Sequence, residues 1–218
     1  MHEVIRRSFY NVNRVSAGKL IFKAVTCAFI ICAVLSMTSF SAQSESISES
    51  ILRVHIIANS DSEKDQSLKL KVRDMVQKLC YNIYSENDTG TLEQAEAVIS
   101  DNLGYIEECV QQEVYAQGFD YTASAELVNM YFTNRTYGDI TLPAGYYDAV
   151  RIVLGEGKGH NWWCVMFPPI CIGAAENKAE ISDVLNEKQT DTVTNGSYVY
   201  KFKIYEIYCD LSEKLNGK

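Results

Sequence analysis

The pattern of apolar and polar positions separates an N-terminal segment from the rest of the chain. Ala24 to Phe40 forms an apolar run without a charge, and the residues before it carry five basic side chains against one acid. A basic region, an apolar run and small residues such as those at 39–41 are the layout of a secretory signal. The run also reaches the shorter lengths that can span a bilayer. The pattern predicts a signal peptide or membrane anchor over 1–41, with the remaining chain exported.

A serine- and glutamate-rich segment over 42–50 is typical of a linker, and the folded part is expected to begin near Ile51. Residues 51–218 are enough for one domain with a sizeable core. The β-branched and apolar run over 51–58 predicts its first strand.

Two segments with apolar residues at helical spacing follow this strand. The capping residues at 59–62, with Ser60 and Glu63 as a capping box, precede the first, and Thr91 with Gln94 fits a capping box for the second. Gly118 is a natural stop, and the short connection predicts antiparallel neighbours. The apolar positions at helical spacing are Leu68, Val72, Met75, Val76, Leu79 and Ile83, then Leu92, Ala95, Ile99, Leu103, Ile106, Val110 and Val114.

The second half of the chain has mainly strand character, with strands predicted over 123–133, 146–154 and 161–167. The predicted fold is α+β: two antiparallel helices packed on one face of a mostly antiparallel sheet, in the order β-α-α-β-β-β with a C-terminal strand and helix. The remaining predictions are a loop over 136–145, a weak helix over 175–185, a polar loop over 187–197, a strand over 198–204 and a short closing helix.

Charge narrows the class of partner. The chain has 20 basic and 28 acidic residues; without the five and one that precede residue 42, the rest carries 15 and 27, a net charge of −12. Such a domain would repel a phosphate backbone, so a nucleic-acid partner is not expected. The simplest role of the charge is solubility.

The stretch 155–171, GEGKGHNWWCVMFPPIC, holds both tryptophans, three glycines and two cysteines. Its glycines fit a hairpin connection rather than a phosphate loop, because no helix follows. Trp162 and Trp163 should point to opposite faces of a strand, one into the core and one toward a partner. The spacing of Cys164 and Cys171 across a Pro-Pro turn favours a disulfide between them. Cys80 and Cys109 could pair with each other or be core cysteines.

Two catalytic or metal constellations are weighed against structural roles. Cys164 with His160 or His55 is the minimum for a secreted thiol hydrolase. His55, Asp61 and Asp65 could form half a metal site or an acid/base pair, although the aspartates are also explained by the helix start beside them. Spacing typical of a zinc site is absent, and neither a metal nor a cofactor is predicted.

Three segments together resemble one family. They are LRVHIIANSDSEKDQSLKLKVRDMV over 52–76, LPAGYYDAVRIVLGEGKGHNWWCVMFPPIC over 142–171 and the closing KFKIYE over 201–206. This combination is similar to the stage II sporulation protein R family. The resemblance implies export from the forespore into the intermembrane space during endospore formation. It also implies activation of a membrane-embedded mother-cell aspartic protease that processes the sigma E precursor, without enzymatic activity of the protein's own.

The resemblance supplies no residue-level mechanism, so the partner-binding residues are a hypothesis from the sequence. The loop after the first strand contributes Asn59, Ser60, Asp61 and Asp65 to it, and the glycine-rich hairpin contributes His160, Asn161, Trp162 and Trp163. Polar loops and exposed tryptophans are frequent contact surfaces.

Overall fold

The computed structural model describes residues 2–87, 89–168, 181, 184–195 and 198–216. The chain forms two compact units, Met1–Ala42 and Gln43–Lys218. Helix α1 (His2–Ser48) contains the apolar run, and its stretch Ala17–Ser48 is the one helix of the described chain long and apolar enough to cross a membrane. Phe22 and Phe29 are 73% and 75% exposed there. Large apolar side chains left unburied over such a length fit the predicted signal or anchor segment.

The second unit is built on a four-stranded sheet with the order β2-β5-β1-β6. Its strands are β1 (Leu52–Ile57), β2 (Ala123–Phe132), β5 (Gly145–Leu154) and β6 (Asn161–Phe167). The β1–β5 pair is parallel, and the β2–β5 and β1–β6 pairs are antiparallel. A parallel pair requires a long crossover, which the two helices and β2 provide. The predicted mostly antiparallel sheet is confirmed.

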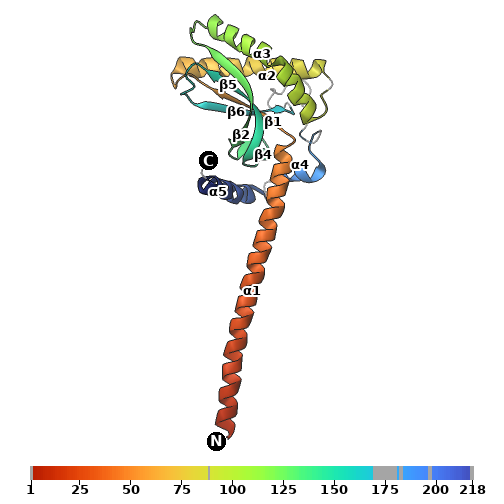
Figure 1. Cartoon of the computed structure of the whole chain (residues 1–218), viewed down its shortest axis with the longest axis vertical. Helices are drawn as coiled ribbons and strands as arrows, with labels where there is room; N and C mark the ends of the chain where they lie inside the picture. Colours follow the sequence, from red (N-terminus) through yellow and green to blue (C-terminus); the bar gives the residue numbers. More distant parts are fainter. Residues whose placement is uncertain (1, 88, 169–180, 182–183, 196–197, 217–218) are drawn as a thin grey trace. The chain divides into compact units, whose positions relative to one another are not determined.

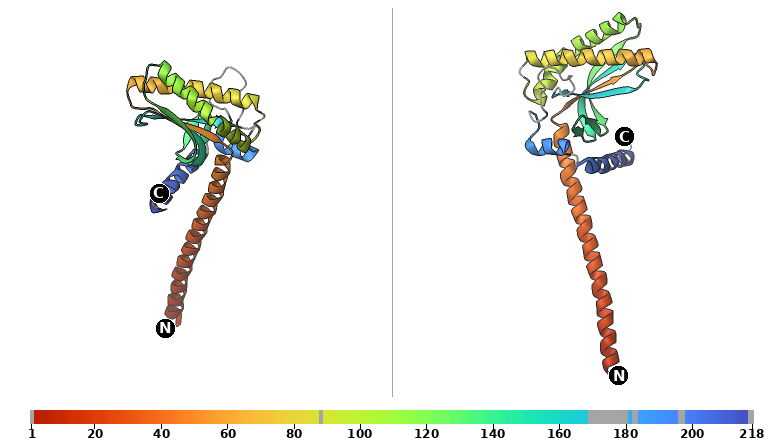
Figure 2. Two further views of the ribbon diagram at one scale, coloured as in Figure 1. Left: turned by 45° about the horizontal axis from the view of Figure 1, so that its top comes forward. Right: turned by 180° about the vertical axis from the view of Figure 1, so that it is seen from behind.

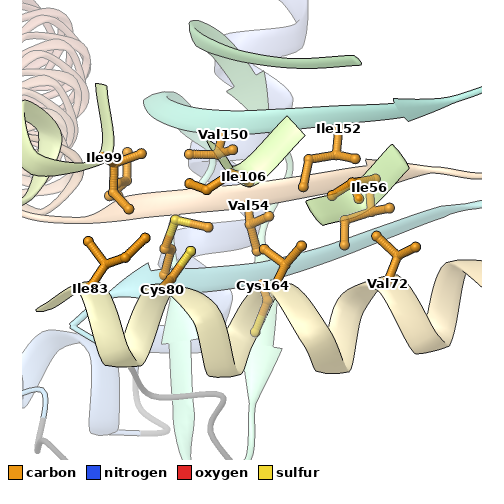
Figure 3. Packing of buried hydrophobic residues seen from close by; sticks show 14 of the residues in the cluster. Val54, Ile56, Val72, Cys80, Ile83, Ile99, Ile106, Val150, Ile152 and Cys164 are labelled. Carbon is orange, nitrogen blue, oxygen red and sulfur yellow. The ribbon is translucent and has the colours of Figure 1, made fainter. Parts of the chain in front are cut away.

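Helices α2 (Glu63–Glu86) and α3 (Leu92–Ala116) lie on one face of this sheet and run in opposite directions (Figures 1 and 2). Val72 and Ile106 from their apolar stripes meet Val54, Val150 and other β-branched residues of the central strands (Figure 3). Every second residue of β1 faces the helices, as strand alternation requires. The amphipathic helices and the face they cover are as predicted.

Two of the three predicted helix-boundary signals are confirmed. Thr91 and Gln94 form the predicted capping box of α3, and Gly118, with φ 81°, follows its end. The predicted Ser60–Glu63 capping box is wrong, because Ser62 is the N-cap of α2 and its hydroxyl accepts from the Asp65 N–H. Ser60 is instead held by a tertiary contact described below.

A second core covers the opposite face of the sheet. Arg53 of β1 is fully buried there, with its guanidinium 4.1 Å from the ring centroid of Phe132 and 4.8 Å from that of Tyr147. Its Nη2 donates to the Tyr137 hydroxyl at 2.5 Å. Aromatic faces attract a desolvated cation, so this arginine acts as part of the core rather than as a surface charge.

Four predictions outside the main sheet are wrong. The predicted loop over 136–145 contains a hairpin of β3 (Arg135–Tyr137) and β4 (Ile140–Leu142), turned by Gly138 at φ 59°. The predicted loop over 187–197 contains helix α4 (Glu187–Thr194), whose start is capped by Asn186 and Gln189. The expected linker over 42–50 is helical to Ser48. There, Ile47 is fully buried and the Gln189 amide donates to the Ser46 carbonyl at 3.1 Å.

The strand predicted over 198–204 is part of helix α5 (Val199–Asn216). The alternation of Phe202 and Ile204 with lysines imitates a strand, but Phe202 and Tyr205, three residues apart, are the buried pair. Asn134 fixes this helix by donating to the Phe202 carbonyl and the Glu206 carboxylate. The helix predicted over 175–185 lies mostly outside the described residues.

Candidate functional site

The loop after β1 and the loop before β6 lie against each other, although they are nearly 100 residues apart. Because β1 and β5 are parallel, both strands deliver the chain to the same edge of the sheet. The Lys158 and Gly159 N–H groups donate to the carbonyls of Asn59 and Ala58 at 3.1 and 2.9 Å. The Glu156 N–H donates to Asn59 Oδ1 at 2.9 Å. The two segments that the sequence suggested as the contact surface therefore form one structural unit, which we call the paired loops (58–65 and 155–160).

The glycines of the second loop are required by this contact. A Cβ on Gly159 would lie 2.2 Å from the Ser60 carbonyl oxygen, a backbone atom that cannot move aside. Gly155 adopts φ 57°, and a Cβ there would lie 2.2 Å from Asn59 Oδ1. Glycine permits both the left-handed conformation and the close approach. The glycine-rich sequence thus serves backbone packing. The predicted hairpin is wrong, because β1 lies between β5 and β6 in the sheet and pairs with both strands.

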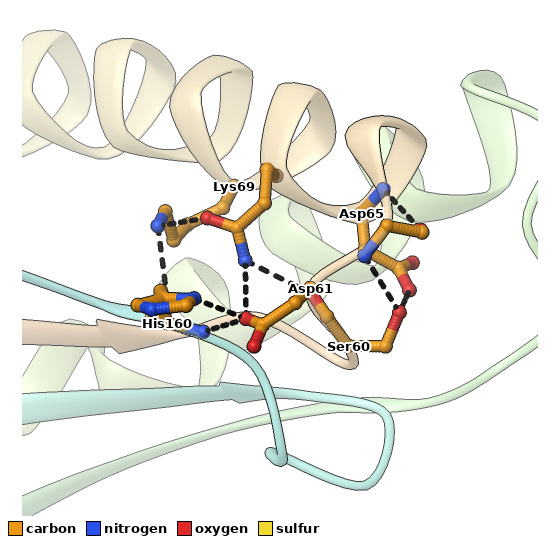
Figure 4. Close-up of polar contacts among 7 residues, drawn as sticks. Ser60, Asp61, Asp65, Lys69 and His160 are labelled. Atoms are coloured by element: carbon orange, nitrogen blue, oxygen red, sulfur yellow. Dashed lines mark hydrogen bonds and ion pairs between the residues drawn. The ribbon is translucent and has the colours of Figure 1, made fainter.

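Asp65 is the polar centre of the paired loops. Its Oδ2 accepts from Ser60 Oγ at 2.5 Å (Figure 4) and from Asn59 Nδ2 at 3.1 Å. Its Oδ1 accepts from the Tyr121 hydroxyl at 2.8 Å. Burial of the carboxyl opposes ionisation, but the hydrogen bonds from Ser60, Tyr121 and Asn59 outweigh it and lower the pKa of Asp65. Asn59, Ser60 and Asp65 are consequently supports of the loop structure.

Asp61 and His160 form the exposed part of the same unit. Asp61 Oδ1 accepts from both the backbone N–H and the Nδ1 of His160, and the two side chains are 55% and 78% exposed. The backbone hydrogen bond, followed by the imidazole contact, lowers the pKa of Asp61. The buried Lys69 ammonium donates to the His160 carbonyl at 2.9 Å from beneath. This surface presents a carboxylate and an imidazole in a fixed arrangement.

The two tryptophans follow His160 along β6 and point to opposite faces. Trp162 packs with the helix-side core and lies below the Arg73 guanidinium, 5.4 Å from the ring centroid. Trp163 packs with the second core, and the Arg135 guanidinium lies 5.6 Å from its ring centroid. The prediction of opposite faces is confirmed. The expectation of one buried and one exposed ring is wrong, because both are half-buried and each carries a cation on its outer side.

An open groove of about 480 Å³ is lined by both tryptophans and Cys164 of β6. Arg73, Asp74 and Gln77 of α2 and Tyr137 of the β3–β4 hairpin also line it. Asn161 connects this groove, which we call the β6 groove, to the paired loops. Seven of the eight predicted contact residues thus belong to the loops or border the groove, and Asn161 joins them.

The thiol-hydrolase arrangement is not assembled in the described chain. Cys164 is 1% exposed and disulfide-bonded, whereas a nucleophile must be an accessible thiolate. His55 stacks on Trp163, so it lies on the opposite face of the sheet from Cys164, the next residue along β6. The His160 ring is bound to Asp61. Cys171 lies outside the described residues, so its pairing with Cys164 stays a prediction. Cys80 and Cys109 are free, and burial raises the pKa of Cys80 to about 12.

The proposed His55, Asp61 and Asp65 constellation is not formed either. His55 stacks on Trp163, Asp61 binds His160, and Asp65 binds Ser60 and Tyr121. Burial lowers the pKa of His55 to about 4, so the ring is neutral at physiological pH. Among the described residues, no group of three or more His, Cys, Asp or Glu side chains could hold a metal ion.

Sequence reasoning did not find four residues that shape the site. Tyr121 and Lys69 support the paired loops, and Arg73 and Arg135 cover the tryptophans. Lys69 falls within the apolar stripe of α2, one residue after Leu68, which is a signal that its ammonium must find buried acceptors. The other three carry no local signal, because their partners lie far away in the sequence.

Comparison with known proteins places this architecture in a family. The family model described as stage II sporulation protein R matches residues 48–177, which is more than half of the chain and includes the paired loops and β6. Stage II sporulation protein R of Bacillus subtilis (strain 168) is 36% identical over 152 residues, covering 67% of this chain and 66% of that protein, just under two thirds of its length. No solved structure matches. The chain therefore belongs to the stage II sporulation protein R family.

Proposed function

We propose that this protein is an exported signalling ligand of endospore formation. It would pass from the forespore into the intermembrane space and activate a membrane-embedded mother-cell aspartic protease that processes the sigma E precursor. Membership of the stage II sporulation protein R family supports the sporulation role. The apolar N-terminal helix supports export, either as a signal or as an anchor.

The observation that carries this proposal is the rigid construction of the paired loops. Asp65, Asn59 and Ser60 form an internal hydrogen-bond network. This network holds the loop that carries Asp61, whose carboxylate binds His160 at the surface. A pre-organised surface loses little conformational entropy on binding. A ligand that activates by binding must favour the active state of its receptor through such contacts.

The charge of the exported part agrees with a protein partner rather than a nucleic acid. Residues 42–218 carry a net charge of −12. Complementary charge on the receptor would steer the encounter, and the short-range contacts would then come from the loops and the tryptophans. The disulfide at Cys164 suits an exported location.

The test is co-expression of the full-length chain with the protease and the sigma E precursor in a cell that otherwise lacks all three. Precursor cleavage that depends on both the chain and the protease is the expected result. Cleavage by the protease alone, at the same rate with and without the chain, would contradict the proposal.

Variants of the exposed pair test the surface within the same assay. Asp61→Ala with His160→Ala should reduce cleavage at least tenfold, because both side chains are exposed and their loss leaves the Asp65 network intact. Asp101→Ala is the matched control, since Asp101 is exposed on α3 outside the paired loops and its loss also removes one carboxylate. Equal cleavage by the double variant and the control would remove the paired loops from the contact surface.

A further inference from the structure

Strand β6 is an edge strand of the main sheet. The order β2-β5-β1-β6 pairs it with β1 on one side, and within the described residues no strand pairs with its other side. Along an edge strand, alternate backbone N–H and C=O groups point away from the sheet and require other partners. Two residues at the start of this strand, Trp162 and Trp163, also line the open β6 groove.

Native edge strands are usually protected against pairing with another chain by inward charges, prolines or a covering segment. The first three residues of β6 have instead an aromatic ring on each side. Trp162 and Trp163 are both half-buried and leave apolar surface on the two sides of one backbone. This is the arrangement that receives an extended peptide, since side chains of an added strand also alternate between the two faces.

The charges at this edge specify the peptide. Arg73 lies over Trp162 and Arg135 lies over Trp163, so a guanidinium is present on each side of the groove. The Arg73 charge is shared with Asp74 at 2.7 Å, whereas Arg135 has no carboxylate within ion-pair distance among the described side chains. In an exported part of net charge −12, this cationic edge is suited to a carboxylate of a partner.

We propose that the free edge of β6 at 161–163 binds an extended segment of the partner protein as an added strand. The backbone of that segment pairs with β6. Apolar side chains on its two faces cover Trp162 and Trp163, and an acidic side chain reaches Arg135. The inference rests on the proposed function for the identity of the partner, and it adds the mode of recognition and the chemistry of the recognised segment.

The two tryptophans make this proposal directly measurable, because they are the only two in the chain. Full-length protein labelled with 5-fluorotryptophan in detergent micelles should give two ¹⁹F resonances, assigned with Trp162→Phe and Trp163→Phe. Unlabelled protease in the same micelles is the probe. Both resonances should shift or broaden on its addition, because the added strand covers both faces of β6.

Hydrogen exchange separates strand addition from a contact of side chains alone. Backbone amides of the peptide containing 161–163 should exchange at least tenfold more slowly in the complex, since outward N–H groups gain acceptors. Shifted ¹⁹F resonances without this protection would overturn the proposed pairing. Resonances that shift when the labelled protein is concentrated alone would identify a second copy of the chain as the occupant, which would also overturn it.

Charge reversal tests the acidic segment. Arg135→Glu should weaken binding of the protease about tenfold or more, because it replaces an attraction by a repulsion. Lys78→Glu is the control, since Lys78 is exposed on α2 outside the groove and its reversal changes the net charge equally. Equal affinities of the two variants would overturn the role of Arg135. If sigma E precursor cleavage depends on the chain while neither ¹⁹F resonance moves, this inference fails and the proposed function stands.

Discussion

His55 of β1 stacks on Trp163 of β6, with ring centroids 3.7 Å apart and planes 5° from parallel. The two residues are direct cross-strand partners. The imidazole is 4% exposed and neither ring nitrogen makes a well-aligned hydrogen bond within the described chain, although the Asn161 side chain is near enough to raise the pKa slightly. Histidine here is an aromatic packing residue that supports the Trp163 ring.

The first prediction concerns the pH dependence of stability. The pKa of His55 is about 4 in the folded state, below the ordinary 6.5, so between these values the unfolded chain binds more protons. Its contribution to the unfolding free energy therefore falls as pH is lowered from 6.5 to 4, by at most about 3 kcal/mol. His55→Phe keeps the stack and should remove this part of the pH dependence. Urea unfolding at pH 7 and pH 5, followed by tryptophan fluorescence, measures it; an equal loss in both proteins would contradict it.

The contribution of Glu96 in α3 to stability should depend on pH in the opposite direction. Burial, and then the neighbouring Asp148 carboxylate, raise the pKa of Glu96 to about 7, so the folded state holds more protons between pH 4.5 and 7. Its contribution to stability falls as pH rises through that window. Glu96→Gln should therefore stabilise the protein at pH 8 by about 1 kcal/mol, allowing for solvent screening, and have little effect at pH 5. Glu108→Gln, on the exposed side of α3, should be neutral at both values in thermal unfolding.

The contact between the paired loops predicts a contrast between two glycine substitutions. Gly159→Ala places a Cβ against the Ser60 carbonyl and should destabilise the protein by about 1–3 kcal/mol, while also weakening partner binding. Gly104 lies at a solvent-exposed position in the middle of α3, with open space around it. Gly104→Ala should therefore stabilise the protein by about 0.5–1 kcal/mol. Thermal melting of both variants decides the matter. A Gly159→Ala protein as stable as Gly104→Ala would mean that the loops are not in contact.

The Asp65 network predicts a further loss. Asp65→Asn keeps the side-chain size but replaces one acceptor oxygen by a donor facing Ser60 and Asn59 or Tyr121, which should cost about 1–3 kcal/mol at pH 7. The wild-type advantage over Asp65→Asn should disappear as pH falls through the lowered folded-state pKa of Asp65, because the carboxyl is then protonated. Asp101→Asn, exposed on α3, is the control, and its melting temperature should stay within a degree or two of wild type.

The sequence alone determined the elements whose signal is local. The stripes beginning at Leu68 and Leu92 identify α2 and α3, and the Thr91–Gln94 capping box identifies where α3 begins. Strands β1, β5 and β6 are readable because β-branched and aromatic residues cluster between turn signals. Local pattern works here because each element buries one face. The spacing of apolar residues along the sequence therefore follows the period of the helix or strand.

Local pattern misled where a different element could explain the same residues. Phe202 and Ile204 alternate like a strand, yet the helix is selected because it places Phe202 and Tyr205 together against the domain with Asn134 at its side. The Ser60–Glu63 pair satisfies the capping rule, but Ser60 Oγ gains more from the buried Asp65 carboxylate. Tertiary contacts outweigh propensities of a few tenths of a kcal/mol.

The candidate site shows the same division. Asn59, Asp61, His160 and the tryptophans could be chosen from the sequence, since a polar loop and two adjacent tryptophans are unusual enough to notice. They come together because β1 and β5 are parallel, so the loops that follow these two strands lie at the same end of the sheet. Asn59 and Glu156, almost 100 residues apart in the sequence, therefore form a hydrogen bond. Composition and periodicity describe neighbours along the chain, whereas strand order, and with it the free edge of β6, is decided by which surfaces pack together in three dimensions.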